Sequence, residues 1–397
     1  MSWSPNRRSV LQAGAATLLA GSAIGRALAG DIPSKPEAGA IKMGIEPWLG
    51  YGIWHIAAKK GIFKANGLEE VEIVNFTADA DINAALAAGQ LQCGNIATHT
   101  SMAFAAAGLP IKIVALLDVS MTADAIISAG TVGSIADLKG KQVAYEEGTT
   151  SDILLNYALS ANGMSIDDIQ KVPMPAADAG SALIAGRVPV AVTYEPYISL
   201  AKAQSDKVKL LYPASENPGL ISDVFIVRDE FVSEKPGQIV ALLKSWEAAL
   251  ADYRANTAEG RAIISEAVGA KPEELATAFD GVTYYSLAEN KTELSGNFVH
   301  KVVPAVKAAA LKAGVLTQDV DLNALIDSRF MHAAYVVLHL LLVPDADLDP
   351  ARAHFEEVQA GGAGKRHSAA QHHAAKPGAR KSRHFIEPLQ LPRQAVG

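Results

Sequence analysis

The segment from Asn75 to Ser101 reads NFTADADINAALAAGQLQCGNIATHTS, and its pattern predicts a helix followed by a short buried strand. Asp79 and Asp81 open the predicted helix, and alanine and glycine residues close it. The predicted strand, Cys93–Ala97, leads directly into the polar sequence Thr-His-Thr-Ser. Polar groups gathered at two loop tips, with small packing residues between them, indicate one side of a binding site.

Short apolar strands alternate with longer amphipathic runs through much of the chain. This alternation is typical of an α/β fold with parallel strands. The predicted strands are residues 41–45, 71–76, 93–97, 111–117, 142–145, 171–173, 190–193, 208–212 and 224–228. After residue 228 the pattern predicts helices only, at residues 236–256, 259–268, 272–279 and 298–313.

The order of these elements predicts two α/β lobes. The first lobe comprises residues 40–128 and 222–330, and the second comprises residues 133–219. The chain is expected to cross between them near Ser128–Gly133 and again near Gly219–Asp223, which makes a two-strand hinge. Glycine and serine at both crossings permit the changes in backbone dihedral angle that hinge closure requires.

The composition excludes some classes of protein. With 49% hydrophobic and 19% charged residues, the chain is typical of folded globular proteins. Its net charge of −7 argues against a nucleic-acid partner bound by a basic surface. Cys93 is the one cysteine in the sequence, which excludes intrachain disulfides and thiolate metal clusters.

Residues 1–29 have the features of an export signal and are left out of the fold. The pair Arg7-Arg8 precedes an apolar run over residues 13–24, and a small-residue cleavage site ends at Ala29. This order resembles a twin-arginine export signal cleaved near Ala29, which predicts a periplasmic protein. A membrane anchor or a disordered basic N-terminus is the alternative, although the apolar run is short for a membrane-spanning helix.

Residues 331–397 differ in composition from the rest of the chain. From Gly361 the sequence is rich in glycine, alanine, histidine, lysine and arginine without an apolar period, which predicts disorder. Seven of the ten histidines lie beyond Phe330, but their spacing fits no defined metal site. We interpret this segment as a disordered tail or as an altered reading frame at the end of the gene.

Four stretches of the sequence together carry a resemblance to a known family. They are WLGYGIWHIAAKKGIFKANGLEEVEIV from Trp48, INAALAAGQLQCGNIA from Ile82, SIADLKGKQVAYEEGTTSDILLNYAL from Ser134 and ALIAGRVPVAVTYEPYIS from Ala182. They resemble the solute-binding proteins of ABC importers in the nitrate, sulfonate and taurine group, over roughly residues 41–330.

The resemblance implies a type II periplasmic-binding-protein fold, in which two α/β lobes joined by a two-strand hinge close on a small solute. It also implies that the protein delivers this solute to a membrane permease with its ATPase subunits and performs no catalysis. On this basis we expect a monomer without a cofactor or a metal.

Candidate ligand-binding residues follow from the position of ligands in such folds. Ligands bind in the crevice outside the carboxyl ends of the strands, so the polar and aromatic residues just after predicted strands are candidates. They are Trp48, Tyr51, Asp79, Asp81, Thr98, His99, Asp118, Glu146, Thr149, Thr150, Tyr194, Glu195 and Asp223. Structural roles are the alternative. Either Asp79 or Asp81 caps a helix, and the stretches that begin at Thr98 and Thr149 suit N-caps. His99 and the tyrosines then serve in packing.

The charges of the predicted strand ends argue against an anionic ligand. They carry no lysine or arginine but seven acidic residues, Asp79, Asp81, Asp118, Glu146, Glu147, Glu195 and Asp223. Like-charge repulsion disfavours an anion there, whereas a cation such as guanidine or an amine is held by carboxylates and aromatic faces. A taurine, alkylsulfonate or nitrate ligand remains the alternative, with its anionic end at the predicted helix start of residues 149–151.

Two further classes of protein compete with an importer component. Enzymes that make the thiamine pyrimidine share this fold and this kind of sequence, but they rely on a histidine and a cysteine-rich iron-binding segment, which Cys93 alone does not supply. The sequence also lacks the G-x-S-x-G and H-E-x-x-H motifs of hydrolases, so we expect no enzyme. A periplasmic sensor partner would bind the same solute and dock on a receptor instead.

Overall fold

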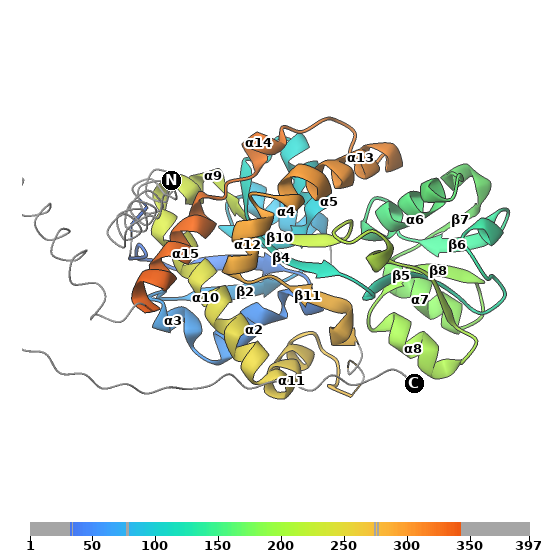
Figure 1. Ribbon diagram of the computed structural model, residues 1–397, viewed down its shortest axis with the longest axis horizontal. Helices are drawn as coiled ribbons and strands as arrows, with labels where there is room; N and C mark the ends of the chain where they lie inside the picture. Colours follow the sequence, from blue (N-terminus) through green and yellow to red (C-terminus); the bar gives the residue numbers. More distant parts are fainter. Residues whose placement is uncertain (1–31, 34, 77–78, 274, 276–277, 343–397) are drawn as a thin grey trace, which may run out of the picture. The chain divides into compact units, whose positions relative to one another are not determined.

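The computed structural model describes residues 32–33, 35–76, 79–273, 275 and 278–342 (Figure 1). The predicted export signal and the predicted tail beyond residue 342 lie outside these residues. The described strands form two sheets, one of six strands and one of five. We call the part of the chain built on the six-stranded sheet the first lobe and the part built on the five-stranded sheet the second lobe.

The first sheet has the strand order β11-β4-β10-β3-β1-β2. Strand β1 is parallel to β2 and β3, whereas β10 is antiparallel to β3 and β4, and β11 is antiparallel to β4. The strands are β1 (Ile41–Ile45), β2 (Val71–Asn75), β3 (Cys93–Ala97), β4 (Ile111–Ser120), β10 (Ser222–Arg228) and β11 (Val282–Tyr284). Strands β3, β4 and β10 are buried almost throughout, as expected for strands covered by helices on both faces.

Helices cover both faces of the first sheet. Figure 1 shows α4, α5 and α13 on one side and α2, α10 and α11 on the other. The helices of this lobe are η1 (Leu49–Tyr51), α2 (Gly52–Lys59), α3 (Ile62–Ala65), α4 (Asp79–Ala87), α5 (Thr98–Ala106), α9 (Asp229–Glu234), α10 (Pro236–Ala255), α11 (Thr257–Ala267), η5 (Ala278–Gly281), α12 (Leu287–Glu293), η6 (Phe298–Val302), α13 (Val303–Ala313), α14 (Leu322–Leu325) and α15 (Arg329–Leu342).

The second sheet has the strand order β7-β6-β8-β5-β9. Strand β6 is parallel to β7 and β8, and β5 is antiparallel to β8 and β9. The strands are β5 (Asp124–Ser128), β6 (Gln142–Tyr145), β7 (Gln170–Pro173), β8 (Val190–Tyr194) and β9 (Lys209–Pro213). The helices of this lobe are η2 (Ala136–Leu138), α6 (Thr150–Ala161), η3 (Ile166–Asp168), α7 (Ala176–Ile184), α8 (Tyr197–Gln204) and η4 (Ala214–Glu216).

The first crossing between the lobes lies earlier than the sequence predicted. Residues 124–128 were assigned to the first lobe, but they form β5, which pairs with β8 and β9 of the second sheet. The chain therefore crosses at residues 121–123 and returns at residues 214–221. The two crossings are hydrogen-bonded to each other, because Ser215 N donates to Met121 O at 2.7 Å and Ser120 N donates to Ile221 O at 3.0 Å.

The C-terminal part of the first lobe also differs from the prediction. A short strand, β11, interrupts the expected run of helices, and the last two residues of the predicted helix at 272–279 belong to the 3-10 helix η5, which continues to Gly281. The predicted tail begins too early, because residues 331–342 belong to α15. This helix is held to the core by Phe330, Met331 and Ala334, all of which are buried.

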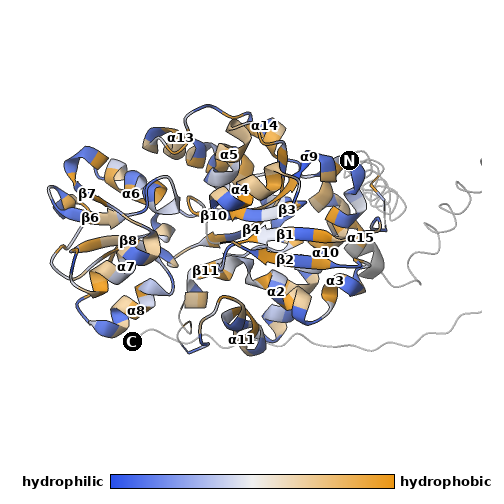
Figure 2. Ribbon diagram, turned by 180° about the vertical axis from the view of Figure 1, so that it is seen from behind, coloured by the Kyte–Doolittle hydropathy of each residue, from blue (hydrophilic) through white to orange (hydrophobic). Residues whose placement is uncertain are grey.

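An aromatic cluster fixes α2 onto the first sheet. The Trp54 ring lies 4.9 Å from that of Trp246 on α10, 5.3 Å from that of Phe225 on β10 and 6.1 Å from that of Phe63 on α3. The indole N–H of Trp54 donates to Asn95 Oδ1 at 2.9 Å. In Figure 2 the helices carry hydrophobic and hydrophilic residues side by side, as expected of helices that pack one face on a core.

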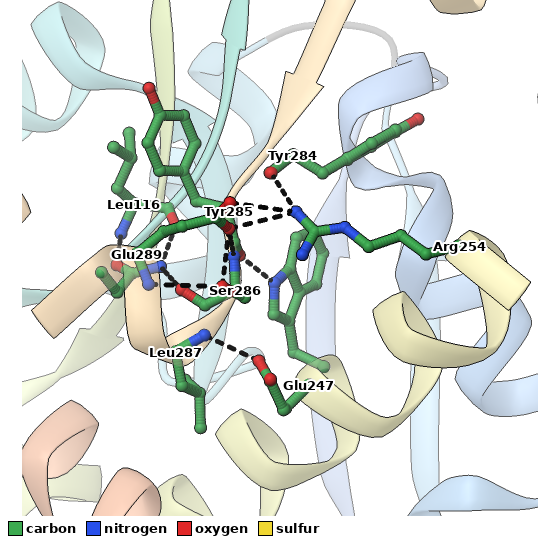
Figure 3. A network of polar contacts seen from close by, with 10 residues as sticks. Leu116, Glu247, Arg254, Tyr284, Tyr285, Ser286, Leu287 and Glu289 are labelled. Atoms are coloured by element: carbon green, nitrogen blue, oxygen red, sulfur yellow. Dashed lines mark hydrogen bonds and ion pairs between the residues drawn. The ribbon is translucent and has the colours of Figure 1, made fainter. Parts of the chain in front are cut away.

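A polar network ties α10 and α12 to the edge of the first sheet (Figure 3). Arg254 Nη2 donates to Tyr284 O at 3.0 Å and forms an ion pair with Glu289, while Ser286 and Glu289 form a capping box at the start of α12. Behind them Asn290, which is fully buried, bonds the backbone of Leu116 on β4 with both ends of its amide at 2.8 Å. The side chain of Asn290 therefore completes the hydrogen bonding of β4 where β11 does not reach.

We expect Asn290→Ala to lower the free energy of unfolding by about 2–4 kcal/mol, because it leaves a buried N–H and a buried carbonyl of Leu116 without partners. Urea unfolding of the full chain measures this change. Asn323→Ala is the matched control, since Asn323 is exposed and its loss should change the free energy by about 0.5 kcal/mol or less. Equal effects of the two substitutions would contradict the role given to Asn290.

Candidate functional site

A cavity of about 760 Å³ lies where elements of the two lobes meet. Its volume is in the range of cavities that hold small molecules. The first lobe contributes residues after β1, on α4, at the start of α5 and on β10. The second lobe contributes residues from β5, from the start of α6 and from the end of β8.

Five carboxylic acids line this cavity, and none of its described lining residues is lysine or arginine. They are Glu46, Asp79, Asp124, Glu146 and Asp223. Glutamate and aspartate side chains that are shielded from water and gathered together repel one another when they are ionised. The cavity is therefore electrostatically unfavourable for an added negative charge and favourable for a positive one.

Glu46 is at the centre of this acidic cluster. It follows the last residue of β1 and is partly buried. Burial, followed by the charges of Asp79, Asp223 and Glu146, raises the pKa of Glu46 from 4.5 to about 8. A carboxyl group of this kind holds a proton near neutral pH unless a cation takes its place.

Asp223 and Asp124 show the same effect at the ends of β10 and β5. Burial raises the pKa of Asp223 to about 6, against the lowering effect of a hydrogen bond from the Tyr51 hydroxyl at 2.8 Å. Burial likewise raises the pKa of Asp124 to about 7. Both carboxyl groups keep more of their protons in the folded chain than they would in water.

His99, Thr100 and Asp79 form a short hydrogen-bonded row on the first lobe. The Thr100 hydroxyl donates to Asp79 Oδ2 at 2.9 Å, and its oxygen lies 3.4 Å from His99 Nε2. Burial lowers the pKa of His99 to about 4, so its imidazole is neutral near pH 7. Burial also raises the pKa of Asp79, although the hydrogen bond from Thr100 opposes this.

Aromatic side chains from both lobes meet at the cavity. The Trp48 ring of the first lobe lies edge-to-face on the Tyr194 ring of the second, with centroids 6.3 Å apart. Tyr194 in turn lies edge-to-face on Tyr197, with centroids 5.6 Å apart. Aromatic faces next to carboxylates are a common environment for an organic cation.

The second lobe adds hydrogen-bonding groups at the starts of two helices. Glu146 Oε2 accepts from Ala176 N, at the start of α7, at 3.0 Å. Thr149 caps α6 by accepting from Ser151 N at 3.3 Å, and Thr150 is the first residue of that helix. The structure thus brings Glu146, Thr149 and Thr150, three of the predicted site residues, to the cavity.

Nine of the thirteen predicted site residues line the cavity, and four do not. Asp81 is exposed on α4, where an aspartate in the first turn interacts with the helix dipole. Thr98 is buried and donates to Ser222 O at 3.0 Å, which joins α5 to β10. Glu195 accepts from Ser199 N and Ser199 Oγ at 3.0 Å each, so it stabilises the first turn of α8.

Asp118 is the fourth predicted residue that does not line the cavity. It is fully buried behind Trp48, whose indole N–H donates to Asp118 Oδ1 at 3.3 Å. Asp118 supports the lining from behind and does not form part of it.

Glu46, Asn83 and Asp124 are among the lining residues that the sequence did not predict. Glu46 follows the predicted strand at 41–45 directly, so the rule applied to the other strands should have found it. Asp124 opens β5, a strand that the pattern did not reveal, and Asn83 lies one turn into α4. Across the described ranges, no three acidic, histidine or cysteine side chains are grouped closely enough to hold a metal ion.

Comparison with known proteins relates the chain to one family. A family model described as NMT1/THI5 like matches residues 52–259. A putative binding protein of Brucella abortus (strain 2308) is 32% identical over 234 residues, which are 57% of this chain and 69% of that protein. The 4-amino-5-hydroxymethyl-2-methylpyrimidine phosphate synthase of Schizosaccharomyces pombe is 24% identical over 210 residues, 50% of this chain and 60% of that enzyme.

Solved structures show the same fold. The periplasmic aliphatic sulphonate binding protein of Escherichia coli superimposes with a TM-score of 0.64 at 20% identity, covering 73% of this chain and 92% of that protein. This likeness and the two sheets confirm the predicted fold class, a periplasmic-binding-protein fold with two α/β lobes.

The acidic cluster makes the stability of the ligand-free chain depend on pH. Between the pKa of 4.5 and the raised value of about 8, the folded chain keeps a proton on Glu46 that the unfolded chain has released. Because the folded state binds more protons, the free energy of unfolding falls as pH rises through this window. The raised pKa values of Asp124 and Asp223 act in the same direction.

We expect Glu46→Gln to flatten this pH dependence, since glutamine has no proton to lose. Urea unfolding of the full chain at several pH values between about 5 and 8 measures the slope. Glu273→Gln, at an exposed glutamate, is the control and should leave the slope unchanged. A slope that is the same in all three proteins would show that Glu46 ionises freely in the folded chain.

Proposed function

Because this chain belongs to the NMT1/THI5-like family, we propose that it is the periplasmic solute-binding component of an ABC importer and that its solute carries positive charge on nitrogen. The observation that carries the proposed charge is the composition of the cavity: five carboxylic acids without a lysine or arginine among its described lining residues. A small amine, an amidine or guanidine has the N–H donors and the charge that such a cavity can bind.

The proposed solute replaces protons in the acidic cluster. A cation near Glu46, Asp79 and Asp223 lowers the pKa values that burial and mutual repulsion raise. Binding is then coupled to the release of protons, so the affinity for a cation falls as pH drops below about 8. An anion has the opposite dependence, because it needs these groups protonated.

The aromatic side chains and the neutral histidine complete the proposed site. Trp48 and Tyr194 come from opposite lobes, so a solute held beside them is enclosed as the lobes close. His99, neutral because its pKa is lowered by burial, adds no repulsive charge to a cation. Closure then amounts to a shift in population toward the form in which both lobes contact the solute.

The role in import is supported by the family and by the fold. The Brucella abortus relative is named as a putative binding protein. The periplasmic aliphatic sulphonate binding protein of Escherichia coli has the same fold. In this proposal the partners are a membrane permease and its ATPase subunits, and the residues before Ala29 direct export. A sensor partner in place of a permease is the nearest alternative, and co-purification with membrane components separates the two.

A sulfonate ligand and an enzymatic role are the competing proposals. The start of α6 at Thr149 and Thr150 supplies backbone N–H groups to the cavity, which favours an anionic group such as that bound by the sulphonate binding protein. The likeness to a pyrimidine phosphate synthase favours an enzyme, but Cys93 alone does not provide the cysteine-rich segment that this chemistry is expected to use.

A ligand panel tests the charge of the solute. We expect guanidine, amidines or small amines to raise the melting temperature of the full chain, since a ligand that binds only the folded state stabilises it. The same panel contains taurine, alkylsulfonates, nitrate and pyrimidines. Stabilisation by sulfonates or nitrate without any by cations would overturn the proposed charge but leave the role in import standing.

Glu46→Gln tests where the cation is held. A hydrogen bond to a charged group contributes about 1.5–3 kcal/mol, so we expect the affinity for the cation to fall about 10- to 150-fold in calorimetry. Glu147→Gln is the matched control, because Glu147 is exposed and is not among the lining residues. An unchanged affinity in the Glu46 variant would place the cation elsewhere in the cavity.

A further inference from the structure

Asp118 and Asp223 face each other across the hinge strands. They are directly paired in the antiparallel ladder of β4 and β10, which places their side chains on the same face of the sheet. Asp118 is fully buried and Asp223 nearly so. The first crossing to the second lobe begins within three residues of Asp118, so this pair stands at the base of the hinge.

One carboxyl oxygen of Asp118 has no hydrogen-bond partner among the described residues. Asp118 Oδ1 accepts from Trp48 Nε1, but Oδ2 is buried without a hydrogen-bond partner among the described residues. Asp118 Oδ2 is packed against the backbone of Gly50, where an added Cβ would lie 2.1 Å from that oxygen. An ionised carboxylate oxygen left in such a place is strongly unfavourable.

A proton on one of the two carboxyl groups would remove the repulsion between them and supply a hydrogen-bond donor. Asp118 and Asp223 are directly paired in the β4–β10 ladder with their side chains on one face, and two ionised carboxylates placed there cannot hydrogen-bond to each other because both only accept. Asp223 already accepts from the Tyr51 hydroxyl and reaches the cavity, which favours Asp223 as the ionised partner. Asp118 is then the partner that carries the proton.

The described groups that shift the pKa of Asp118 include Asp223, Trp48 and Asp124, none of which carries a positive charge. From the neighbouring elements Asp118 is faced by Asp223 on β10, Asp124 on β5, Tyr51 of η1, and Tyr284 and Tyr285 at the end of β11. Burial, followed by the charge of Asp223, raises the pKa of Asp118 well above its ordinary value.

We propose that Asp118 is a positioning residue: it keeps one proton, donates it to Asp223, and holds the Trp48 indole against Tyr194 of the opposite lobe. The pair then presents a single negative charge, on Asp223, to the cavity. The protonation of Asp118 and the placement of Trp48 do not depend on the identity of the solute. Only the effect on solute affinity rests on the proposed function.

The protonation state is measured without any ligand. In full chain labelled with ¹³C at aspartate carboxyl carbons, the Asp118 signal is assigned by its absence in Asp118→Asn. We expect its chemical shift at about pH 7 to be that of a protonated acid. An ionised Asp118 at that pH would overturn the proposal, whatever the outcome of the ligand panel.

Two substitutions separate positioning from charge. Asn at position 118 can still donate to Asp223 and accept from Trp48, whereas Leu can do neither. We expect Asp118→Asn to leave the indole N–H resonance of Trp48, assigned with Trp48→Phe, close to its wild-type position, and Asp118→Leu to shift it. If Asp118→Leu does not fold, the asparagine variant alone decides: a displaced Trp48 resonance in that variant contradicts the positioning role.

Solute affinity supplies the last readout. With a cation that the panel identifies, we expect Asp118→Asn to bind within about threefold of wild type, in contrast to the loss in Glu46→Gln. A loss in Asp118→Asn as large as that in Glu46→Gln would show that Asp118 acts as a negative charge, which overturns the proposal. If no cation binds, the proposed charge of the solute is overturned, while the ¹³C and indole measurements still decide the state of Asp118.

Discussion

The mutual repulsion of buried carboxyl groups is the constraint on which the arrangement of this cavity depends. Glu46, Asp79, Asp124, Glu146 and Asp223 come from separate elements of the two lobes and meet in one cavity. Such a cluster persists only if its members hold protons, accept hydrogen bonds or face a cation. The raised pKa of Glu46, about 8, records how strongly burial and the neighbouring charges act on one of them.

The fold brings these groups together because strands end where the lobes meet. Strands β1 and β3 run parallel, so the residues that follow them reach the same edge of the first sheet. The return strand β10 lies between β3 and β4 and is antiparallel to both. Its beginning, with Asp223, therefore lies at the same edge as the end of β3. Two hydrogen-bonded crossings then carry the second lobe, with Glu146 and Tyr194, to the other side of the cavity.

Sequence patterns predicted strands well where a polar residue marks the strand end, and less well where no such signal is present or the strand is very short. The strands at 41–45 and 93–97 were placed correctly because each is a short, mainly apolar run with a polar residue, Glu46 or Thr98, directly after it. Strand β5 was missed because Asp124 opens it and its neighbours continue the apolar character of β4, so no turn signal marks the crossing. Strand β11 has three residues, too few for alternation to be detected.

By itself, the sequence determined the fold class and the acidic character of the site, because alternating strands and helices permit few topologies and strand ends converge on one edge. It could not determine which acids face the cavity. Glu195 accepts hydrogen bonds from Ser199 in the first turn of α8, and Asp118 is bonded to the indole of Trp48, although both follow the same pattern as the lining residues. Only tertiary packing decides this, since the direction of a side chain at a strand end depends on neighbours that are distant in the sequence.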